Sequence, residues 1–535
     1  MSLKKLCSLL LAITMLSAFV IGCSSTASKV GVDKPLRFGQ LAEPETLDPR
    51  LATGQPEMQF LLQMYEGLTT YDANNNAVPA AAEKWDVSQD GLTYTFHIRK
   101  EAKWSNGDPI TAEDFEYAWK TLLSPELGSR YAEMLFYVKN GEAYNSGKAK
   151  AEDVGVKAID NNTLEVTLQE PTPYFPQLTA CYSYFPVHKK TVEADPNWAS
   201  DPKTMVTNGP FTLTNWVHNE KAEFVKNENY WDSSKVKSKK LEFAIVENNT
   251  TRVSLFENDQ VDITLNPPPS EIERLIKEKE VTIEPLLATY YYDFNVNKAP
   301  FDNPKVRKAF TLAIDRDAIV SKVTRASQKP AAAFVPIGLP DMELGSDFRK
   351  AGGHFYKDND IETAKKLLAE AGYPDGKGLP PITLLYNTHE GHKAIAEAIQ
   401  EMWKKNLGVQ VELENQEWKV FIKSRAAGDY QVARDGWTGD FPDPLTFLSL
   451  LTSNNGNNNS HWKNSQFDQL IKQAKSTSDL AARIKVMHDA EKLLMDEMPV
   501  MPIYYYTVDY MIKPNVKGLV HTVTDYIYFK EAYVE

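Results

Sequence analysis

The spacing of hydrophobic positions along residues 35–535 follows two different periods. Residues 92–98 and 163–168 carry apolar side chains at every second position, which predicts strands with one buried face. Residues 393–405 instead place apolar side chains three and four positions apart, as one face of a helix does. Because both patterns interleave along the chain, we expect a mixed α/β protein.

Polar residues and glycines mark where the expected helices begin and end. Asn303 and Asp360 each precede an apolar helical run, and their side chains can accept hydrogen bonds from the free N–H groups of a first turn. Gly372 and Gly408 follow such runs and predict helix ends. A strand is expected over residues 409–413, directly after the second glycine.

Residues 454–459 form a low-complexity stretch of five asparagines and one glycine. Asparagine and glycine both favour turns, so this stretch predicts a surface loop. Residues 431–440 predict a strand that leads into a loop broken by Pro442 and Pro444. Period-two alternation places Trp437 on one face of this strand. Four residues share the other face: Arg434, Gly436, Thr438 and Asp440.

The N-terminal segment has the pattern of an export signal. Lys4 and Lys5 precede an apolar run over residues 6–21, which as a helix would span about 24 Å, short of the roughly 30 Å hydrocarbon core. The run ends in Val-Ile-Gly-Cys23, which matches the lipobox of bacterial lipoproteins. We expect a lipoprotein signal peptide over 1–22, a lipid on Cys23 and a flexible tether over 23–34. A plain secretory signal with an incidental cysteine is the alternative.

Composition narrows the function classes. A chain of 535 residues suggests about three or four domains. The formal net charge of −13 disfavours a duplex nucleic-acid binder, because phosphate contact needs clustered cations. The three cysteines, two of which lie at the extreme N-terminus, give no disulfide framework, and Cys181 is expected to be a small buried hydrophobe.

Motifs for enzyme chemistry are weak. The sequence contains neither a P-loop nor a G-x-S-x-G elbow. His389-Glu390-Gly391-His392 lacks one residue of the zinc-protease motif, and Asp435, Asp440 and Asp443 do not have calcium-loop spacing. We therefore expect no catalytic residues, no metal and no cofactor.

Residues 82–115 read AEKWDVSQDGLTYTFHIRKEAKWSNGDPITAEDF, which closely resembles the signature of the extracytoplasmic solute-binding proteins of peptide ABC importers, known as family 5. Four further segments follow in the family's order: Asn208–Phe211, Asn229–Asp232, Val306–Ala309 and the aspartate-proline segment around Asp440. The resemblance covers nearly all of the chain after the signal peptide.

This resemblance implies a three-domain clam-shell of the periplasmic-binding-protein-like type II class, an α/β fold with a discontinuous domain I plus an extra domain II. Domain I would comprise residues 35–65, 190–288 and 508–535. Domain II would comprise 66–189 and domain III 289–507.

The resemblance also implies a peptide site. Asp440 corresponds to the aspartate that meets the peptide α-ammonium. Arg434, Arg425 and His392 correspond to positions that neutralise the carboxylate or support the pocket, and Asp435 can neutralise one arginine. Competing interpretations remain at these positions: Asp440 could cap the following turn, either arginine could be a solvated surface charge, and His392 could cap its helix.

Backbone pairing and aromatic walls complete the implied site. Main-chain groups of a ligand could add to the strand at Gly436 and Thr438, since Gly436 leaves room for another backbone. Thr53, Gly54 and Gln55 would pair with the ligand from the other lobe. The expected walls are Trp418, Trp437, Tyr131, Tyr291, Asp293 and Tyr506; for the tyrosine runs at 290–292 and 504–506 the alternative is ordinary core strand.

The implied function is an extracytoplasmic oligopeptide-binding lipoprotein, a monomer anchored to the membrane by the lipid on Cys23 in a Gram-positive bacterium. Its partners would be a membrane permease and ATPase subunits, with no nucleic acid. Alternative cargoes on the same fold are dipeptides, murein peptides, signalling peptides, nickel chelates and oligosaccharides. An extracellular hydrolase or a chaperone-like surface protein is the alternative of a different class.

Overall fold

The computed structural model describes residues 34–535 except 74–75, 343–345 and 478. The predicted signal peptide, Cys23 and nearly all of the predicted tether therefore lie outside the described residues. Within the described part of the chain, no helix combines the length and the hydrophobicity needed to cross a bilayer.

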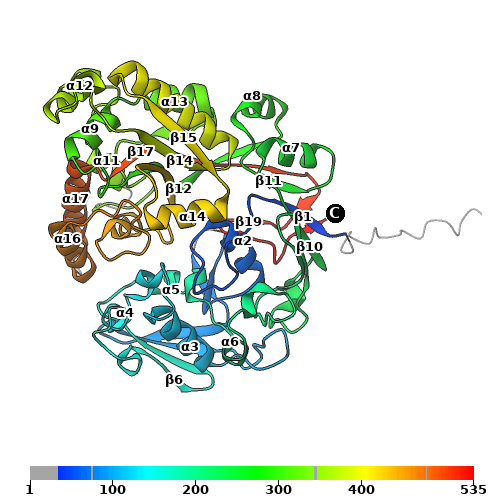
Figure 1. Ribbon diagram of the computed structural model, residues 1–535. Coiled ribbons are helices and arrows are strands. Elements are labelled where there is room, and N and C mark those ends of the chain that lie inside the picture. Colours follow the sequence, from blue (N-terminus) through cyan, green and yellow to red (C-terminus); the bar gives the residue numbers. More distant parts are fainter. Residues whose placement is uncertain (1–33, 74–75, 343–345, 478) are drawn as a thin grey trace, which may run out of the picture.

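A mixed sheet, eleven-stranded as far as the chain is described, runs through the centre of the molecule (Figure 1). Its strands are β1 (Leu36–Gln40), β8 (Phe211–Val217), β9 (Lys221–Lys226), β10 (Lys240–Ile245), β11 (Ile263–Leu265), β12 (Thr282–Phe294), β13 (Lys329–Pro330), β14 (Ile382–Asn387), β15 (Val411–Gln416), β16 (Val432–Thr438) and β17 (Val500–Ile512). Their order is β15-β14-β16-β12-β17-β11-β1-β10-β9-β8, and β13 pairs with β17.

Strands β12 and β17 join the two halves of this sheet. We name residues 34–281 and 513–535 lobe A and residues 295–499 lobe B; the two strands belong to both. Their antiparallel register breaks between Pro285 and Thr289 of β12. A break in the ladder locally bends and twists a strand pair, so the sheet can bend at this point between the lobes.

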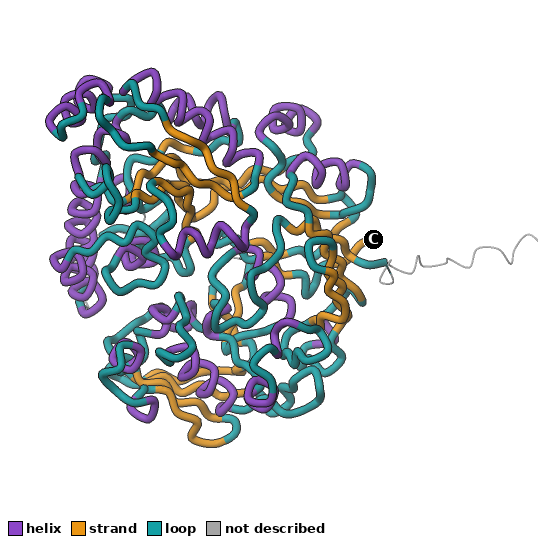
Figure 2. Tube along the Cα trace, in the orientation of Figure 1, coloured by secondary structure: helices purple, strands orange, loops and turns teal. Residues whose placement is uncertain are grey.

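Lobe B surrounds its part of the sheet with helices (Figure 2). They are α9 (Pro304–Leu312), α10 (Arg316–Ala318), α11 (Phe348–Gly352), α12 (Ile361–Glu370), α13 (Glu390–Leu407), α14 (Trp418–Ala427), α15 (Leu445–Leu448), α16 (Ser465–Ser476) and α17 (Leu480–Glu497). The side chains of Asn303 and Asp360 cap α9 and α12 as predicted.

The helix predicted over 393–405 is confirmed as α13, but it begins earlier, because the His389 side chain accepts a hydrogen bond from the N–H of Gly391. The strand expected over 409–413 begins only at Val411. Gly408 ends α13 in the left-handed region, and residues 409–410 connect it to β15.

Lobe A packs a second, smaller sheet and its helices below the central sheet in the view of Figure 1. The four-stranded antiparallel sheet has the order β4-β5-β7-β6. The strands of this sheet are β4 (Ala82–Val87), β5 (Thr93–Ile98), β6 (Val156–Asp160) and β7 (Thr163–Thr167). The remaining strands of lobe A are β2 (Thr69–Tyr71), β3 (Ala77–Pro79), β18 (Val516–Lys517), β19 (Val520–His521), β20 (Ile527–Tyr528) and β21 (Tyr533–Val534). Strands β5 and β7 confirm the alternating patterns over 92–98 and 163–168, and their apolar residues are buried.

The helices of lobe A are α2 (Gln55–Met64), α3 (Ala112–Leu123), α4 (Gly141–Asn145), α5 (Phe175–Leu178), α6 (Lys189–Ala194), α7 (Asn249–Glu257) and α8 (Pro269–Glu278). Short helical turns across both lobes are η1 (Ala132–Leu135), η2 (Ala151–Asp153), η3 (Tyr182–Tyr184), η4 (Trp198–Ser200), η5 (Ser233–Lys235), η6 (Ile319–Thr324), η7 (Pro374–Gly376) and η8 (Ser449–Leu451).

The prediction of a surface loop at residues 454–459 is wrong. Four of its asparagines are buried, each less than a tenth exposed: Asn455, Asn457, Asn458 and Asn459. Their amides take the hydrogen-bonding role that water has in a surface loop. For example, Asn458 Nδ2 donates to the carbonyl of Trp462 at 2.8 Å. An amide carries donors and an acceptor, so an asparagine-rich segment can be satisfied inside the protein.

Candidate functional site

A cavity of about 250 Å³ lies between the two lobes. Lobe A contributes Thr53, Gly54, Gln55 and Tyr131 to its wall. From lobe B and the shared strands come the predicted site residues His392, Trp418, Arg425, Arg434, Gly436, Trp437, Thr438, Asp440 and Tyr506. The fold therefore brings together all of the predicted pocket residues except Tyr291 and Asp293.

Strand β16 presents an unpaired edge to this cavity. Along one edge β16 pairs with β12 over its whole length. Along the other edge β14 pairs only with Val432 and Ala433, so among the described residues no strand covers the edge from Arg434 to Thr438. An uncovered edge can pair with an extended main chain.

Gly436 is needed at its position for a reason that the sequence did not reveal. A Cβ atom there would lie 2.8 Å from Tyr506 Oη and 3.2 Å from Arg434 Nη2. The glycine thus makes room for the Arg434–Tyr506 contact. Its N–H donates to Asp435 Oδ1 at 2.7 Å, so a ligand that pairs with this N–H must displace or share that bond.

The Asp440 carboxyl group is buried in the cavity wall and bonded to two hydroxyls. Asp440 is 7% exposed. Tyr131 Oη of lobe A donates to Oδ1, and Thr446 Oγ1 donates to Oδ2 at 3.0 Å. The pKa of Asp440 is raised to about 6, chiefly by burial. The bond to Thr446 fixes the loop around Asp440. No lysine, arginine or histidine of the described residues pairs with this carboxyl group, so it lacks a countercharge.

Arg434 is the cation of the cavity that has no acidic partner among the described residues. Its Nη2 donates to Tyr506 Oη at 2.5 Å, and its guanidinium lies 4.9 Å from the centre of the Tyr290 ring. The Nε atom is buried without a hydrogen-bond acceptor. The guanidinium is thus positioned by aromatic side chains, and it forms no ion pair with an acidic side chain of the described residues.

Arg425 differs, because Asp435 neutralises it. Arg425 Nη1 lies 2.5 Å from Asp435 Oδ1, and Asn459 Nδ2 donates to Asp435 Oδ2 at 3.0 Å. Asp435 is 4% exposed. The expectation that Asp435 pairs with one of the two arginines is therefore met by Arg425, and the asparagine-rich segment supplies part of this arrangement.

His392 lies in the first turn of α13 and is neutral. Burial lowers its pKa well below the ordinary value, and the nearby Arg434 and His389 lower it further. Its Nδ1 shares a hydrogen bond of 3.3 Å with Tyr290 Oη. His392 can thus accept or donate a hydrogen bond but does not supply a charge.

His389 is a cavity residue that sequence reasoning missed. It caps α13, stacks on His392 with ring centres 4.3 Å apart, and shares a hydrogen bond of 2.8 Å with Asn249 Nδ2 of lobe A. The sequence showed it only as half of a defective zinc motif. Throughout the described part of the chain, no group of three or more histidine, cysteine and acidic residues is placed to hold a metal ion.

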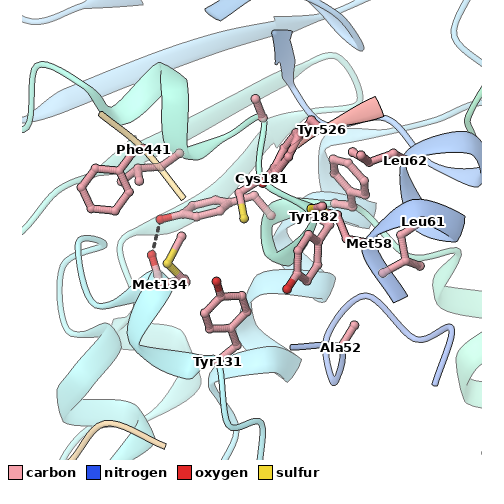
Figure 3. Close-up of a cluster of buried hydrophobic side chains, with 14 of the residues drawn as sticks. Ala52, Met58, Leu61, Leu62, Tyr131, Met134, Cys181, Tyr182, Phe441 and Tyr526 are labelled. Atoms are coloured by element: carbon pink, nitrogen blue, oxygen red, sulfur yellow. Dashed lines mark hydrogen bonds between the residues drawn. The ribbon is translucent and has the colours of Figure 1, made fainter. Parts of the chain in front are cut away.

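Aromatic rings line the cavity from both lobes. The rings of Tyr131 and Trp437 meet edge to face across the lobes, with centres 6.0 Å apart. Figure 3 shows Tyr131 beside Tyr182, a second missed residue, with Tyr526 and Cys181 close to them. Cys181 is fully buried and unpaired, which confirms its predicted role as a small hydrophobe.

Tyr291 and Asp293 differ from the prediction that they line the wall. Tyr291 is 1% exposed and packs edge to face on Phe334, with ring centres 5.0 Å apart. Asp293 is 2% exposed, and its pKa is raised by burial and by its neighbour Asp435. Both side chains are buried outside the cavity lining.

The lobes are in direct contact around the cavity. Asn457 Nδ2 of lobe B donates to the carbonyl of Arg130 in lobe A at 3.0 Å. A Cβ atom on Gly54 would lie 2.9 Å from the Trp418 ring of the other lobe. Such contacts describe a closed arrangement of the two lobes.

One related binding protein has two solved structures that match this arrangement to different degrees. A structure of the Escherichia coli murein tripeptide binding protein MppA matches with a TM-score of 0.88 and 37% identity, covering 94% of this chain and 98% of that one. The unliganded open form of MppA reaches a TM-score of only 0.62 at the same identity, with 94% and 97% coverage.

Further comparisons agree over most of the chain. The Bacillus subtilis oligopeptide-binding protein OppA is 43% identical over 501 residues, which cover 92% of this chain and 91% of that protein. Haemophilus influenzae OppA in complex with RPPGFSPFR has 36% identity and a TM-score of 0.87, covering 93% and 98% of the two chains. The family model "Bacterial extracellular solute-binding proteins, family 5 Middle" matches residues 76–459. The chain therefore belongs to the bacterial extracellular solute-binding proteins of family 5.

Proposed function

We propose that this protein captures oligopeptides between its two lobes and delivers them to the membrane permease of an ABC importer, whose ATPase subunits supply the energy. One observation carries the proposal: Asp440 presents a buried carboxyl group without a cation in the wall of a closed cavity. A peptide with a free α-ammonium group supplies the missing countercharge. An oligosaccharide would not.

The other end of the peptide would meet Arg434. A guanidinium can bond both oxygens of a carboxylate, and Arg434 is not neutralised by an acidic side chain of the described residues. Arg425 would act indirectly, by fixing Asp435 and the strand around it. His392 would contribute a neutral hydrogen bond beside the Arg434 guanidinium.

The peptide backbone would pair with the uncovered edge of β16, at Gly436 and Thr438, and with Thr53, Gly54 and Gln55 from lobe A. Each backbone bond contributes only about 0.5–1.5 kcal/mol net, so several bonds and the charge anchors act together. Since main-chain groups are common to all peptides, this pairing selects the ligand's extended backbone and leaves its side chains to the cavity walls, which include Trp418, Trp437 and Tyr506.

Opening and closing would occur at the register break shared by β12 and β17. On this account domain I comprises 35–65, 190–288 and 508–535, domain II 66–189 and domain III 289–507. These boundaries place the crossings at 288/289 and 507/508, next to the break between Pro285 and Thr289. A ligand that contacts both lobes favours closure because only the closed form makes all of its contacts.

The protein would work outside the cytoplasm as a monomer, held to the membrane of a Gram-positive cell by a lipid on Cys23, with residues 23–34 as the tether. It would bind its cargo without cleaving it. The range of cargo, including dipeptides, murein peptides or a signalling peptide, would depend on the side-chain pockets of the cavity.

A peptide screen tests this function. Purified protein should be stabilised against heat by short peptides with free termini, and small-angle X-ray scattering should show a smaller radius of gyration with saturating peptide. Mass spectrometry should find the peptides intact. Cleavage products would instead indicate a hydrolase, and an unchanged radius of gyration would contradict the closing of the lobes.

A further inference from the structure

The cavity contains a second buried acid, Asp509, which belongs to the shared strand β17. Asp509 lies in the cavity wall and is 7% exposed. Within the described ranges no side chain forms a hydrogen bond or an ion pair with its carboxyl group, whose one hydrogen-bonding neighbour is its own backbone N–H. An acid buried to this degree ordinarily has a partner, because an unpaired charge inside a protein is costly.

The residues around Asp509 do not require an acidic side chain at this position. Its carbonyl accepts a hydrogen bond from Asn266 at 2.8 Å, and its backbone pairs with Ile283 of β12, so the strand itself needs no acidic side chain here. The nearby Asp525 is already bonded to His521 Nε2, at 2.8 Å, and to Gln55 Nε2. Burial and the charge of Asp525 raise the pKa of Asp509 to about 7.

We infer that Asp509 forms a side-chain subsite that selects a positively charged residue, lysine or arginine, in the bound peptide. This inference rests on the proposed function. A cationic side chain that enters the cavity at Asp509 makes a charge-assisted hydrogen bond and supplies the countercharge that the protein lacks. Asp440 meets the α-ammonium, which every unblocked peptide has, so Asp509 adds a preference among peptides.

The sheet register separates this subsite from the α-amine anchor. Gly439, next to Asp440, is bonded to Leu287 of β12, whereas Asp509 is paired with Ile283 two strands away from β16. Strand spacings of about 4.8 Å and rises of about 3.4 Å place Asp440 and Asp509 about 15 Å apart. A cation at Asp509 is therefore distinct from the α-ammonium at Asp440, and a positional scan identifies the peptide residue that supplies it.

A positional scan tests the subsite. Tetra- and pentapeptides of alanine, with lysine or uncharged norleucine at one position at a time, are titrated into wild-type protein and into Asp509→Asn by calorimetry. Lysine should bind about 10- to 100-fold more tightly than norleucine at one position in the wild type. Asp509→Asn should abolish this preference and leave the affinity for the norleucine peptides within about threefold.

Glu284→Gln is the matched control. It removes one negative charge close by on the same sheet, but Glu284 is exposed and lies outside the cavity wall, so the lysine preference should persist. If lysine is not preferred at any position, or if its preference survives in Asp509→Asn, the subsite is refuted while peptide binding itself stands. If none of the peptides binds to the wild type, the proposed function fails and the subsite fails with it.

Discussion

Asp440→Asn is expected to weaken the binding of a peptide with a free α-amine by at least about 100-fold. The substitution keeps the shape of the side chain but removes the charge that balances the ammonium group. Breaking a buried ion pair by removing one partner typically costs about 3–5 kcal/mol, and about 2.7 kcal/mol corresponds to a 100-fold change in the dissociation constant. Isothermal titration calorimetry on the variant and the wild type measures the change.

Two controls separate this effect from a general loss of structure. Asp341→Asn removes an equally buried acid of lobe B that is paired with His488 outside the cavity, and it should leave the affinity within about twofold. A pH series is the second control. The empty-site pKa of Asp440 is about 6, and a bound cation lowers it, so wild-type affinity should decrease as the pH falls below 6. An Asp440→Asn variant that binds as tightly as the wild type would refute the role of this residue.

Asp435→Leu is expected to lower the free energy of unfolding by about 3–5 kcal/mol. It leaves the Arg425 guanidinium without its ion pair, and the Asn459 amide and the Gly436 N–H without their acceptors. An unpaired buried charge accounts for most of this loss. Urea denaturation followed by circular dichroism measures the difference from the wild type.

The double variant Arg425→Met, Asp435→Leu provides the matched comparison. Replacing both charges by apolar side chains of similar volume removes the unpaired cation, so the double variant should be more stable than Asp435→Leu alone. A single variant within about 1 kcal/mol of the wild type, or a double variant that is less stable than the single one, would show that this ion pair does not hold β16 and α14 together.

The sequence predicted those features that depend on local pattern. Alternation over 92–98 and 163–168 corresponds to β5 and β7, and Asn303 and Asp360 do cap their helices. The family resemblance led to a set of site residues, all of which line the cavity except Tyr291 and Asp293. These signals concern residues that are neighbours in the chain, or a pattern that the whole family shares.

Features that depend on contacts between distant segments could not be predicted from local pattern. Asn459 belongs to a segment that looked like a surface loop, yet it completes the bonding of Asp435 inside lobe B. Asp509 was not singled out by the sequence, and only the fold shows that it lies in the cavity wall without a side-chain partner among the described residues. Whether Arg425 or Arg434 keeps a free charge likewise depends on which guanidinium reaches Asp435 in three dimensions.

The most direct test of the account compares one peptide in two forms on wild-type protein, with a free and with an acetylated α-amine. Acetylation removes the ammonium charge and leaves the side chains and the carboxylate unchanged. Because the account assigns that charge to the carboxyl group of Asp440, calorimetry should show at least about 100-fold weaker binding of the acetylated form. Equal affinities for the two forms would contradict it.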